Sequence, residues 1–271
     1  MISIDELYSG TVLAEPVPSL SDVRGSVLGR YGEEGYIAVE DAFSSAQIDA
    51  ALEGLAALTM NPRTADIQYE KWVADRLEEF DGPARMDCTR RLMQFVDLEP
   101  ALKAIAYDEQ LLRVARKIIG EDDIVLFQDM ALMKPPGGGR EKPWHQDNAF
   151  FTIKPGTPIV GIWIALDKAT VANGCMHVIP GSHREGPVIH FKRRDFQICD
   201  TDVQTWRDVA VPLDPGGLLI FDGLLHHGTP PNTTDTRRRA LQFHYIARSA
   251  QMVSQGERLA AFGSEGKDAS C

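Results

Sequence analysis

The feature that most constrains this fold is a series of short apolar segments separated by turn-forming residues. After Gly120 the segments alternate with clusters of Gly, Pro, Asn and Asp. They are Ile124–Phe127, Ala131–Met133, Val160–Leu166, Met176–Ile179, Leu218–Phe221 and Ala240–Ile246. Short apolar runs bounded by turn residues are typical of strands in an antiparallel sandwich or barrel. We therefore expect a double-sheet jelly roll in this half of the chain.

The preceding part of the chain carries helical patterns. Ser44 followed by Gln47 has the spacing of a capping box, which predicts a helix that continues through Leu58. The apolar spacing over Glu99–Ile119 predicts one long helix or two abutting helices, closed by Gly120. We expect these helices to pack on the jelly roll.

The whole chain, residues 1–271, is predicted to be a single domain of the α+β class, mainly β. Residues 1 to about 30 are expected to form an N-terminal arm. A helical part is expected over about 41–120 and the jelly-roll core over about 121–250. The polar, Gly- and Ser-containing end, about 251–271, is predicted to be a loose tail.

Composition narrows the possible partners and the compartment. The chain has 28 Lys and Arg residues and 39 Asp and Glu residues, which gives a net charge of -11. This charge would repel a polyanion, so we expect no nucleic-acid partner. No apolar run reaches membrane-spanning length and no signal-peptide pattern opens the chain, so we expect no membrane partner. The four cysteines form no Cys-x-x-Cys pair, which favours a reducing, cytoplasmic compartment. The oligomeric state stays unknown.

Trp144-His145-Gln146-Asp147 is the first segment that indicates chemistry. On an extended chain residues i and i+2 point to the same side, so His145 and Asp147 can face one metal ion together. A second histidine from a distant strand would complete a two-histidine, one-carboxylate set, which leaves adjacent positions open and suits Fe(II). A lone His-x-Asp is weak, and the alternative is a surface turn with two polar residues.

The candidate third ligand lies in a pair of adjacent histidines, His226 and His227, and the spacing alone does not choose between them. Arg238 follows His227 by eleven residues, within a run of three arginines. An arginine can hold a carboxylate through two parallel charge-assisted hydrogen bonds. Strand alternation predicts that Arg238 points inward while Arg237 and Arg239 point to solvent. The alternative is a solvated edge or a nonspecific anion patch.

Several further segments accompany these two in a fixed order. The complete set is Lys134–Pro136, Trp144–Asp147, Gly161–Leu166, Asn173–Met176, Ile179–His183 and His227 to Arg238. Together they resemble the phytanoyl-CoA dioxygenase (PhyH) family of Fe(II)- and 2-oxoglutarate-dependent oxygenases, over roughly residues 28 to 250. Each motif alone is unspecific, but the set in this order is specific.

The resemblance implies a double-stranded β-helix (jelly-roll) core in which Fe(II) is bound by His145, Asp147 and His227. The family's interval between histidine and arginine selects His227 rather than His226. The resemblance also implies 2-oxoglutarate as cosubstrate, with its far carboxylate on Arg238, and O2 as the second cosubstrate. Supporting cosubstrate contacts are implied for Gln128, Lys134 and Trp163.

The implied reaction is hydroxylation of an aliphatic C–H of a small-molecule substrate, with release of succinate and CO2. Asp147, a carboxylate that related halogenating enzymes lack, favours oxygen insertion over halogenation. One alternative is a catalytically degenerate jelly-roll protein that binds a small ligand. Another is a cupin-like hydrolase or isomerase that uses zinc or manganese on the same ligands. The intact ligand set and Arg238 speak against both, and the identity of the substrate stays open.

Other candidate residues are given structural roles. His177 and His183 are interpreted as structural, and His244 as a sheet-face histidine that could approach the site. Basic residues ahead of the jelly roll could meet an anionic substrate, but we interpret them as solvated. They are Arg30, Lys71, Arg76, Arg85, Arg90 and Arg91.

Overall fold

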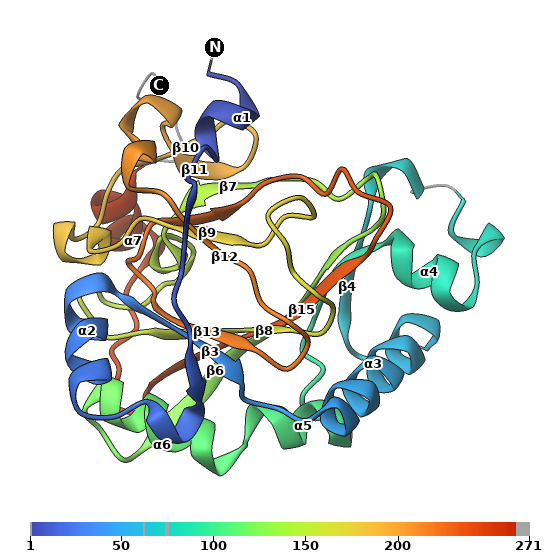
Figure 1. Ribbon diagram of the computed structural model, residues 1–271, viewed down its shortest axis with the longest axis horizontal. Helices are drawn as coiled ribbons and strands as arrows, with labels where there is room; N and C mark the ends of the chain where they lie inside the picture. The colour runs from blue at the N-terminus through green and yellow to red at the C-terminus, as the bar shows by residue number, and fades with distance from the viewer. Residues whose placement is uncertain (1, 62, 74–75, 264–271) are drawn as a thin grey trace.

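The computed structural model describes residues 2–61, 63–73 and 76–263. Within these ranges the strands form one sheet of eight strands, one of five and a separate two-stranded hairpin (Figure 1). The two large sheets share a core that includes Trp163 and Leu219 from the larger sheet and Met176 and Val178 from the smaller one. This is the predicted α+β, mainly β, jelly roll.

Strand order explains how distant segments meet. The larger sheet runs β2 (Val17–Ser19), β3 (Tyr36–Asp41), β13 (Leu218–Asp222), β8 (Val160–Ala165), β15 (Arg238–Ala247), β6 (Ile124–Lys134), β5 (Thr89–Met93), β4 (Asp66–Tyr69). The smaller sheet runs β1 (Val12–Leu13), β12 (Val209–Val211), β9 (Met176–Val178), β14 (His227–Thr229), β7 (Lys142–His145). The hairpin consists of β10 (His190–Lys192) and β11 (Phe196–Ile198). β1 and β2 pair in parallel with β12 and β3, so the predicted N-terminal arm adds an edge strand to each sheet.

β6 is one continuous strand where the sequence predicted two short ones. It pairs with β15 along its whole length, with one register shift beside His244. Asp129 does not interrupt the strand, because its carboxylate accepts hydrogen bonds from the backbone N–H groups of residues 94–96. A buried acceptor that is satisfied by backbone donors carries little penalty inside a strand. The unbroken strand carries Gln128 and Lys134 on the same face.

The predicted helices are present, and the second predicted segment is divided. α3 (Ser45–Met60) begins at the capping box of Ser44 and Gln47. The segment from Glu99 to Ile119 forms α5 (Pro100–Ala106) and α6 (Glu109–Ile119), because Asp108 caps the second helix through the backbone N–H groups of residues 110 and 111. The remaining helices are α1 (Ile4–Leu7), α2 (Ser26–Glu34), α4 (Gly82–Cys88) and α7 (Gln255–Phe262).

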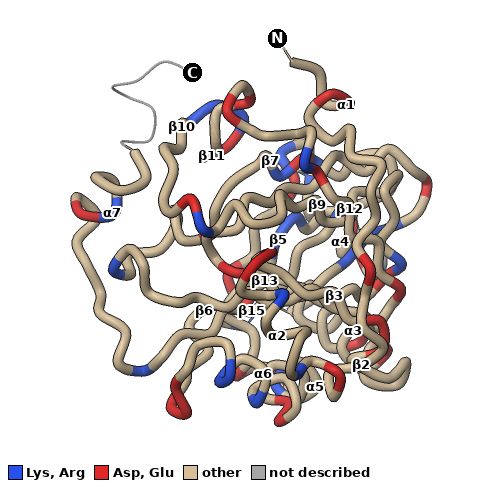
Figure 2. The backbone as a smooth tube through the Cα atoms, turned by 60° about the vertical axis from the view of Figure 1, so that its left-hand side comes forward, with Lys and Arg blue, Asp and Glu red and all other residues tan. Residues whose placement is uncertain are grey.

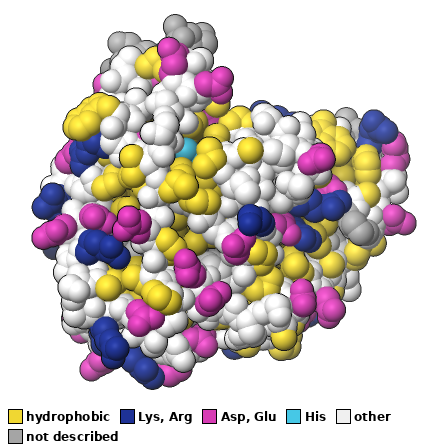
Figure 3. All heavy atoms as spheres, in the orientation of Figure 1, with side chains coloured by type: hydrophobic (Ala, Val, Ile, Leu, Met, Phe, Trp, Pro, Cys, Tyr) yellow, Lys and Arg dark blue, Asp and Glu magenta, His cyan; other side chains and the backbone are white. Residues whose placement is uncertain are grey.

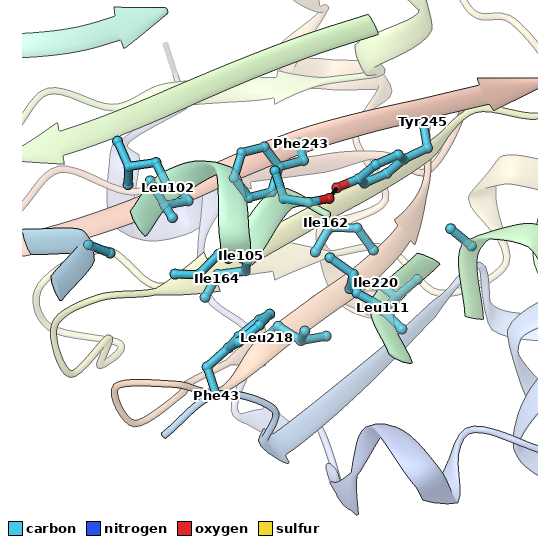
Figure 4. Packing of buried hydrophobic residues seen from close by; sticks show 14 of the residues in the cluster. Phe43, Leu102, Ile105, Leu111, Ile162, Ile164, Leu218, Ile220, Phe243 and Tyr245 are labelled. Atoms are coloured by element: carbon cyan, nitrogen blue, oxygen red, sulfur yellow. Dashed lines mark hydrogen bonds between the residues drawn. The ribbon is translucent and has the colours of Figure 1, made fainter. Parts of the chain in front are cut away.

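Alternation along β15 separates the apolar core from the site. Leu241, Phe243 and Tyr245 belong to the cluster that α5 and α6 cover, where the Tyr245 hydroxyl donates to the Ala106 carbonyl oxygen (Figure 4). The residues between them point to the opposite face. That face carries Arg238, Ala240, Gln242 and His244. The helices therefore cover one face of the larger sheet, and the polar residues of β15 face the smaller sheet.

The end of the described chain is ordered rather than a loose tail. Ser254 and Glu257 form a capping box that opens α7. The helix docks through Phe262, which is 1% exposed, and Arg258 donates to the Ala149 carbonyl oxygen. The prediction of a tail was wrong here because the apolar residues of this short segment are too few to show a helical period. Residues 264–271 lie outside the described residues.

The visible surface is mixed. Figure 3 shows acidic and basic side chains interspersed with apolar ones on one face of the molecule. Of the helices in the described residues, none combines the length and the apolar character that crossing a membrane requires.

Candidate metal centre and its cavity

The two predicted histidine ligands are cross-strand neighbours. His145 on β7 and His227 on β14 are paired in register, and their ring centroids lie 4.2 Å apart. Each ring places Nδ1 at a backbone carbonyl oxygen, 2.8 Å from Pro143 for His145 and 2.9 Å from Leu225 for His227. A carbonyl oxygen only accepts, so both Nδ1 atoms carry the proton. Both Nε2 lone pairs are left available for a metal ion.

Asp147 completes the group from the short 3-10 helix Asp147–Phe150 that directly follows β7. Its Oδ1 lies 3.2 Å from His145 Nε2 and 3.5 Å from His227 Nε2. One ligand atom from each of the three residues lies within 4.8 Å of the others, and all three residues are buried. The structure therefore brings together the three residues that the sequence singled out, in an arrangement that can hold a metal ion.

The second oxygen of Asp147 is held from the opposite sheet. Asp147 Oδ2 lies 2.7 Å from His244 Nε2 and accepts a hydrogen bond of 3.0 Å from Gln242 Nε2. Both residues come from β15 and are buried. With Oδ2 engaged, Oδ1 is the oxygen that faces the histidines. The sequence suggested only that His244 could approach the site, and it gave no indication of Gln242.

The protonation states suit a cation at this position. Burial, together with neighbouring His227 and Lys142, lowers the pKa of His145 to about 4, so the ring is neutral near pH 7. Burial alone would raise the pKa of Asp147, but His227, His244 and His145 hold it well below its usual range. Two imidazoles that each present Nε2, together with one carboxylate, are a donor set that divalent transition metals bind.

An aromatic residue supports one of the histidines. The ring of Phe221 on β13 lies 4.8 Å from the ring of His227, centroid to centroid. On the other side, a Cβ added at Gly161 on β8 would collide with the Phe221 ring. Only glycine therefore leaves room at this position for the phenylalanine that packs against His227.

A cavity of about 380 Å³ opens beside the three residues and reaches Arg238. Arg238 is 2% exposed, and its Nε and Nη1 have no hydrogen-bond partner among the described residues. Burial lowers the pKa of Arg238 to about 10, so it is still a cation near pH 7. A buried, unpaired guanidinium is costly unless a ligand pairs with it, so this end of the cavity is suited to a carboxylate.

The other predicted cosubstrate residues also line the cavity. Trp163 lies beside Arg238, with the guanidinium carbon 5.4 Å from the ring centroid, and its Nε1 has no partner within the described chain. Gln128 Oε1 is likewise buried and unpaired there. Lys134 differs, because its Nζ already donates to the carbonyl oxygens of Thr229 and Pro230.

The remaining arginines and histidines lie elsewhere. Arg237 and Arg239 form ion pairs with Asp87 and Asp167, in keeping with the predicted alternation around Arg238. His226 is buried but faces away from the group formed by His145, Asp147 and His227, since adjacent strand residues point to opposite sides. Two histidines that were interpreted as structural have protein partners: His177 pairs with Asp208 and His183 with the Gly32 carbonyl oxygen.

Comparison with known proteins gives a consistent result. The family model described as phytanoyl-CoA dioxygenase (PhyH) matches residues 31–240. Phytanoyl-CoA dioxygenase domain-containing protein 1 of Danio rerio is 30% identical over 186 residues, which cover 66% of this chain and 64% of that protein. Phytanoyl-CoA dioxygenase of Arabidopsis thaliana is 33% identical over 154 residues, covering 55% and 54%. The chain thus spans between about half and two thirds of these relatives' length.

Solved structures share the fold at low sequence identity. EctD from S. alaskensis, in its apoform, superposes with a TM-score of 0.69 at 24% identity, covering 89% of this chain and 82% of that one. The carbocyclase SnoK from nogalamycin biosynthesis, described as a non-heme alpha-ketoglutarate-dependent enzyme, gives 0.68 at 20% identity, covering 93% and 95%. EvdO2 from Micromonospora carbonacea var. aurantiaca, complexed with 2-oxoglutarate, gives 0.65 at 21%, covering 86% and 94%.

Proposed function

Because the chain belongs to the phytanoyl-CoA dioxygenase (PhyH) family, we propose that it is an Fe(II)- and 2-oxoglutarate-dependent dioxygenase. Its reaction would hydroxylate an aliphatic C–H of a small molecule and release succinate and CO2. One observation supports this most strongly. The three residues that can hold a metal ion and the unpaired Arg238 line the same buried cavity.

His145, Asp147 and His227 would hold Fe(II). The donor set fits, because both imidazoles hold Nδ1 at a backbone carbonyl oxygen and present Nε2, and the carboxylate presents Oδ1 to them. The bound iron, with 2-oxoglutarate and O2, would supply the oxidising chemistry. The chain's own contribution is to fix the three donors. Two backbone carbonyls orient the imidazoles, while Gln242 and His244 orient the carboxylate.

Arg238 would bind the far carboxylate of 2-oxoglutarate. Its two unpaired nitrogens, Nε and Nη1, could donate charge-assisted hydrogen bonds to that group. The unpaired Nε1 of Trp163 offers a further donor in the same cavity. Burial, with repulsion from Arg238, holds the pKa of Lys134 well below its usual range, and its Nζ is directed to the carbonyl oxygens of Thr229 and Pro230. Gln128 would contribute an amide to the same lining.

Part of the lining is apolar and provides a surface for the apolar portion of a substrate. It includes Met130, Leu132, Phe150, Phe151 and Met176. A cavity that combines apolar surface with convergent polar groups is typical of a small-molecule site. Low exposure of the donors strengthens their electrostatic interactions with whatever binds there.

Metal-dependent consumption of 2-oxoglutarate tests the proposal. Purified protein with Fe(II) should form succinate, and His227→Ala should lower the rate by at least about a hundredfold because one of three metal ligands is lost. His183→Ala is the matched control, since that histidine bonds only the Gly32 carbonyl oxygen. Full turnover by His227→Ala would refute the ligand assignment. A wild-type protein without turnover or thermal stabilisation by 2-oxoglutarate would instead be a small-ligand-binding protein.

A further inference from the structure

The cavity has more cationic side chains than a metal ion and 2-oxoglutarate would use. Six basic and four acidic side chains line it, in a chain whose net charge is -11. The basic ones are Arg90, Arg91, Lys134, Arg140, Lys142 and Arg238, and the acidic ones are Glu70, Glu141, Asp147 and Asp195. A divalent ion and the dianion 2-oxoglutarate cancel each other in charge. Burial lowers the pKa of Lys134 well below its usual range, but without Lys134 five basic side chains still line the cavity against four acidic ones. The filled site would therefore keep a small excess of positive charge.

The excess lies at the solvent-facing end of the cavity, which we call the mouth and define by Arg90, Arg91, Arg140, Lys142 and Asp195. Side-chain exposure there is about a third, for example 33% for Lys142 and 32% for Asp195, whereas Arg238 at the inner end is 2% exposed. Figure 2 shows basic and acidic segments close together around β7, the strand that begins with Lys142.

The acidic residues near the mouth are already paired. Glu70 accepts from Arg140 Nε at 2.8 Å, and Asp195 accepts from Lys142 Nζ at the same distance. Glu141 accepts from Arg194 Nε at 2.7 Å. Among the described residues, these pairs leave Arg91 without an acidic partner and leave Arg90 only a 4.0 Å contact with Asp195 Oδ2. Glu70 keeps one buried oxygen, Oε1, without a hydrogen-bond partner.

Arg91 faces the cavity from β5. In the sheet it stands opposite Leu132 on β6 and Gln68 on β4, and paired residues of antiparallel strands point to the same side. Both neighbours line the cavity with it. Within the described residues, the Arg91 side chain has no hydrogen bond or ion pair.

Arg90 is also poorly matched, although it is more buried. Only 27% of its side chain is exposed, and its closest acidic atom, Asp195 Oδ2, is 4.0 Å from Nη2. That distance is beyond a hydrogen bond, and the same oxygen already accepts from Lys142. Burial, with repulsion from Arg140, lowers the pKa of Arg90. The sequence favoured solvated side chains for Arg90 and Arg91; the structure shows both partly exposed and lining the cavity.

We propose that the substrate carries an acidic group, a carboxylate or a phosphate monoester, which Arg90 and Arg91 bind at the mouth. This inference rests on the proposed function and specifies the substrate class for the same cavity. The guanidinium groups of Arg90 and Arg91, which both line the cavity, can each donate paired hydrogen bonds to such a group, which a neutral substrate cannot accept with equal strength. The acidic end would sit at the mouth while the apolar remainder of the substrate reaches the lining near the metal ligands.

Matched acidic and neutral probes test this proposal. Protein loaded with Mn(II) and 2-oxoglutarate is titrated by calorimetry with hexanoate, hexyl phosphate and hexanamide. At least one acid should bind about tenfold or more tightly than the amide, and the tighter acid identifies the carboxylate or the phosphate as the natural group. Arg91→Gln should weaken the acid about tenfold and remove its advantage over the amide, whereas Arg91→Lys should keep part of it.

Arg248→Gln is the control, because it removes an equal charge from a side chain 66% exposed and outside the cavity lining. The proposal is overturned if neither acid binds, if the amide binds as well as the acids, or if Arg90→Gln and Arg91→Gln leave acid binding unchanged. A loss of 2-oxoglutarate affinity in these variants would assign the arginines to the cosubstrate and also overturn it. If 2-oxoglutarate does not bind but the acid preference persists, the proposed function fails and the anion site stands.

Discussion

Replacement of Arg238 by methionine is expected to stabilise the ligand-free protein. The Arg238 residue is 2% exposed with Nε and Nη1 unpaired among the described residues, and burial lowers its pKa from the ordinary arginine value to about 10. A difference of that size corresponds to a folding cost of about 3 kcal/mol. Methionine keeps an apolar stem of similar length and removes the charge, so we expect a gain of about 1–3 kcal/mol after some loss of packing.

The same substitution should sharply reduce the stabilisation by 2-oxoglutarate. Removing one partner of a buried charged pair costs about 2–5 kcal/mol, or roughly thirtyfold to several thousandfold in affinity. The assay is thermal unfolding with Mn(II), with and without 2-oxoglutarate. At a concentration about a hundred times the wild-type dissociation constant the wild type should gain about 2.7 kcal/mol, and Arg238→Met should gain less than about 1 kcal/mol at that concentration.

Arg239→Met is the matched control on the same strand. Arg239 is ion-paired with Asp167, so its loss should destabilise the protein and leave the response to 2-oxoglutarate intact. If ligand-free Arg238→Met is less stable than the wild type, the argument from an unpaired buried cation is wrong. If the variant keeps the full ligand-induced shift, Arg238 does not bind the cosubstrate.

Three further substitutions test residues that lie close to the metal ligands or pack behind them. Gln242→Leu removes a hydrogen bond to Asp147 and should weaken Mn(II) binding about 10- to 100-fold by calorimetry; unchanged affinity would contradict the orienting role. Burial lowers the pKa of His226 in the folded protein to about 4, whereas a histidine in the unfolded chain keeps a pKa of 6.5. Between these two values only the unfolded chain binds the proton, so the free energy of unfolding falls as the pH drops. His226→Leu should therefore reduce the loss of unfolding free energy between pH 7 and pH 5 by about 2 kcal/mol in urea titrations, and an identical loss in both proteins would exclude this cause. Gly161→Ala should cost about 1–3 kcal/mol in the same titrations because its Cβ collides with the Phe221 ring, and a neutral effect would mean that the ring can move aside.

Local patterns in the sequence were sufficient for the parts of the fold that depend on neighbouring residues. The capping box at Ser44 and the stop at Gly120 are set by hydrogen bonds and backbone conformation within a few residues, and both are present. The i, i+2 relation of His145 and Asp147 is equally local, and the structure places their ligand atoms together.

Features that depend on distant contacts were not accessible from the sequence. The continuity of β6 relies on Asp129 accepting from backbone groups more than thirty residues away. The contacts of Gln242 and His244 with Asp147 depend on how the two sheets face each other, which no spacing encodes. The position of Arg90 and Arg91 in the cavity follows from β5 joining the larger sheet beside β6, in a region where only helices were predicted.

The two carboxylate oxygens of Asp147 contact residues from two different sheets. Oδ1 faces the histidines of the smaller sheet, and Oδ2 is held by Gln242 and His244 of the larger one. An ion bound to Oδ1 would therefore act as a cross-link between the layers. The affinity for the metal ion should therefore depend on how closely the two sheets are packed. Metal removal should increase amide hydrogen exchange in β7 and β14 before it affects the helix-covered face.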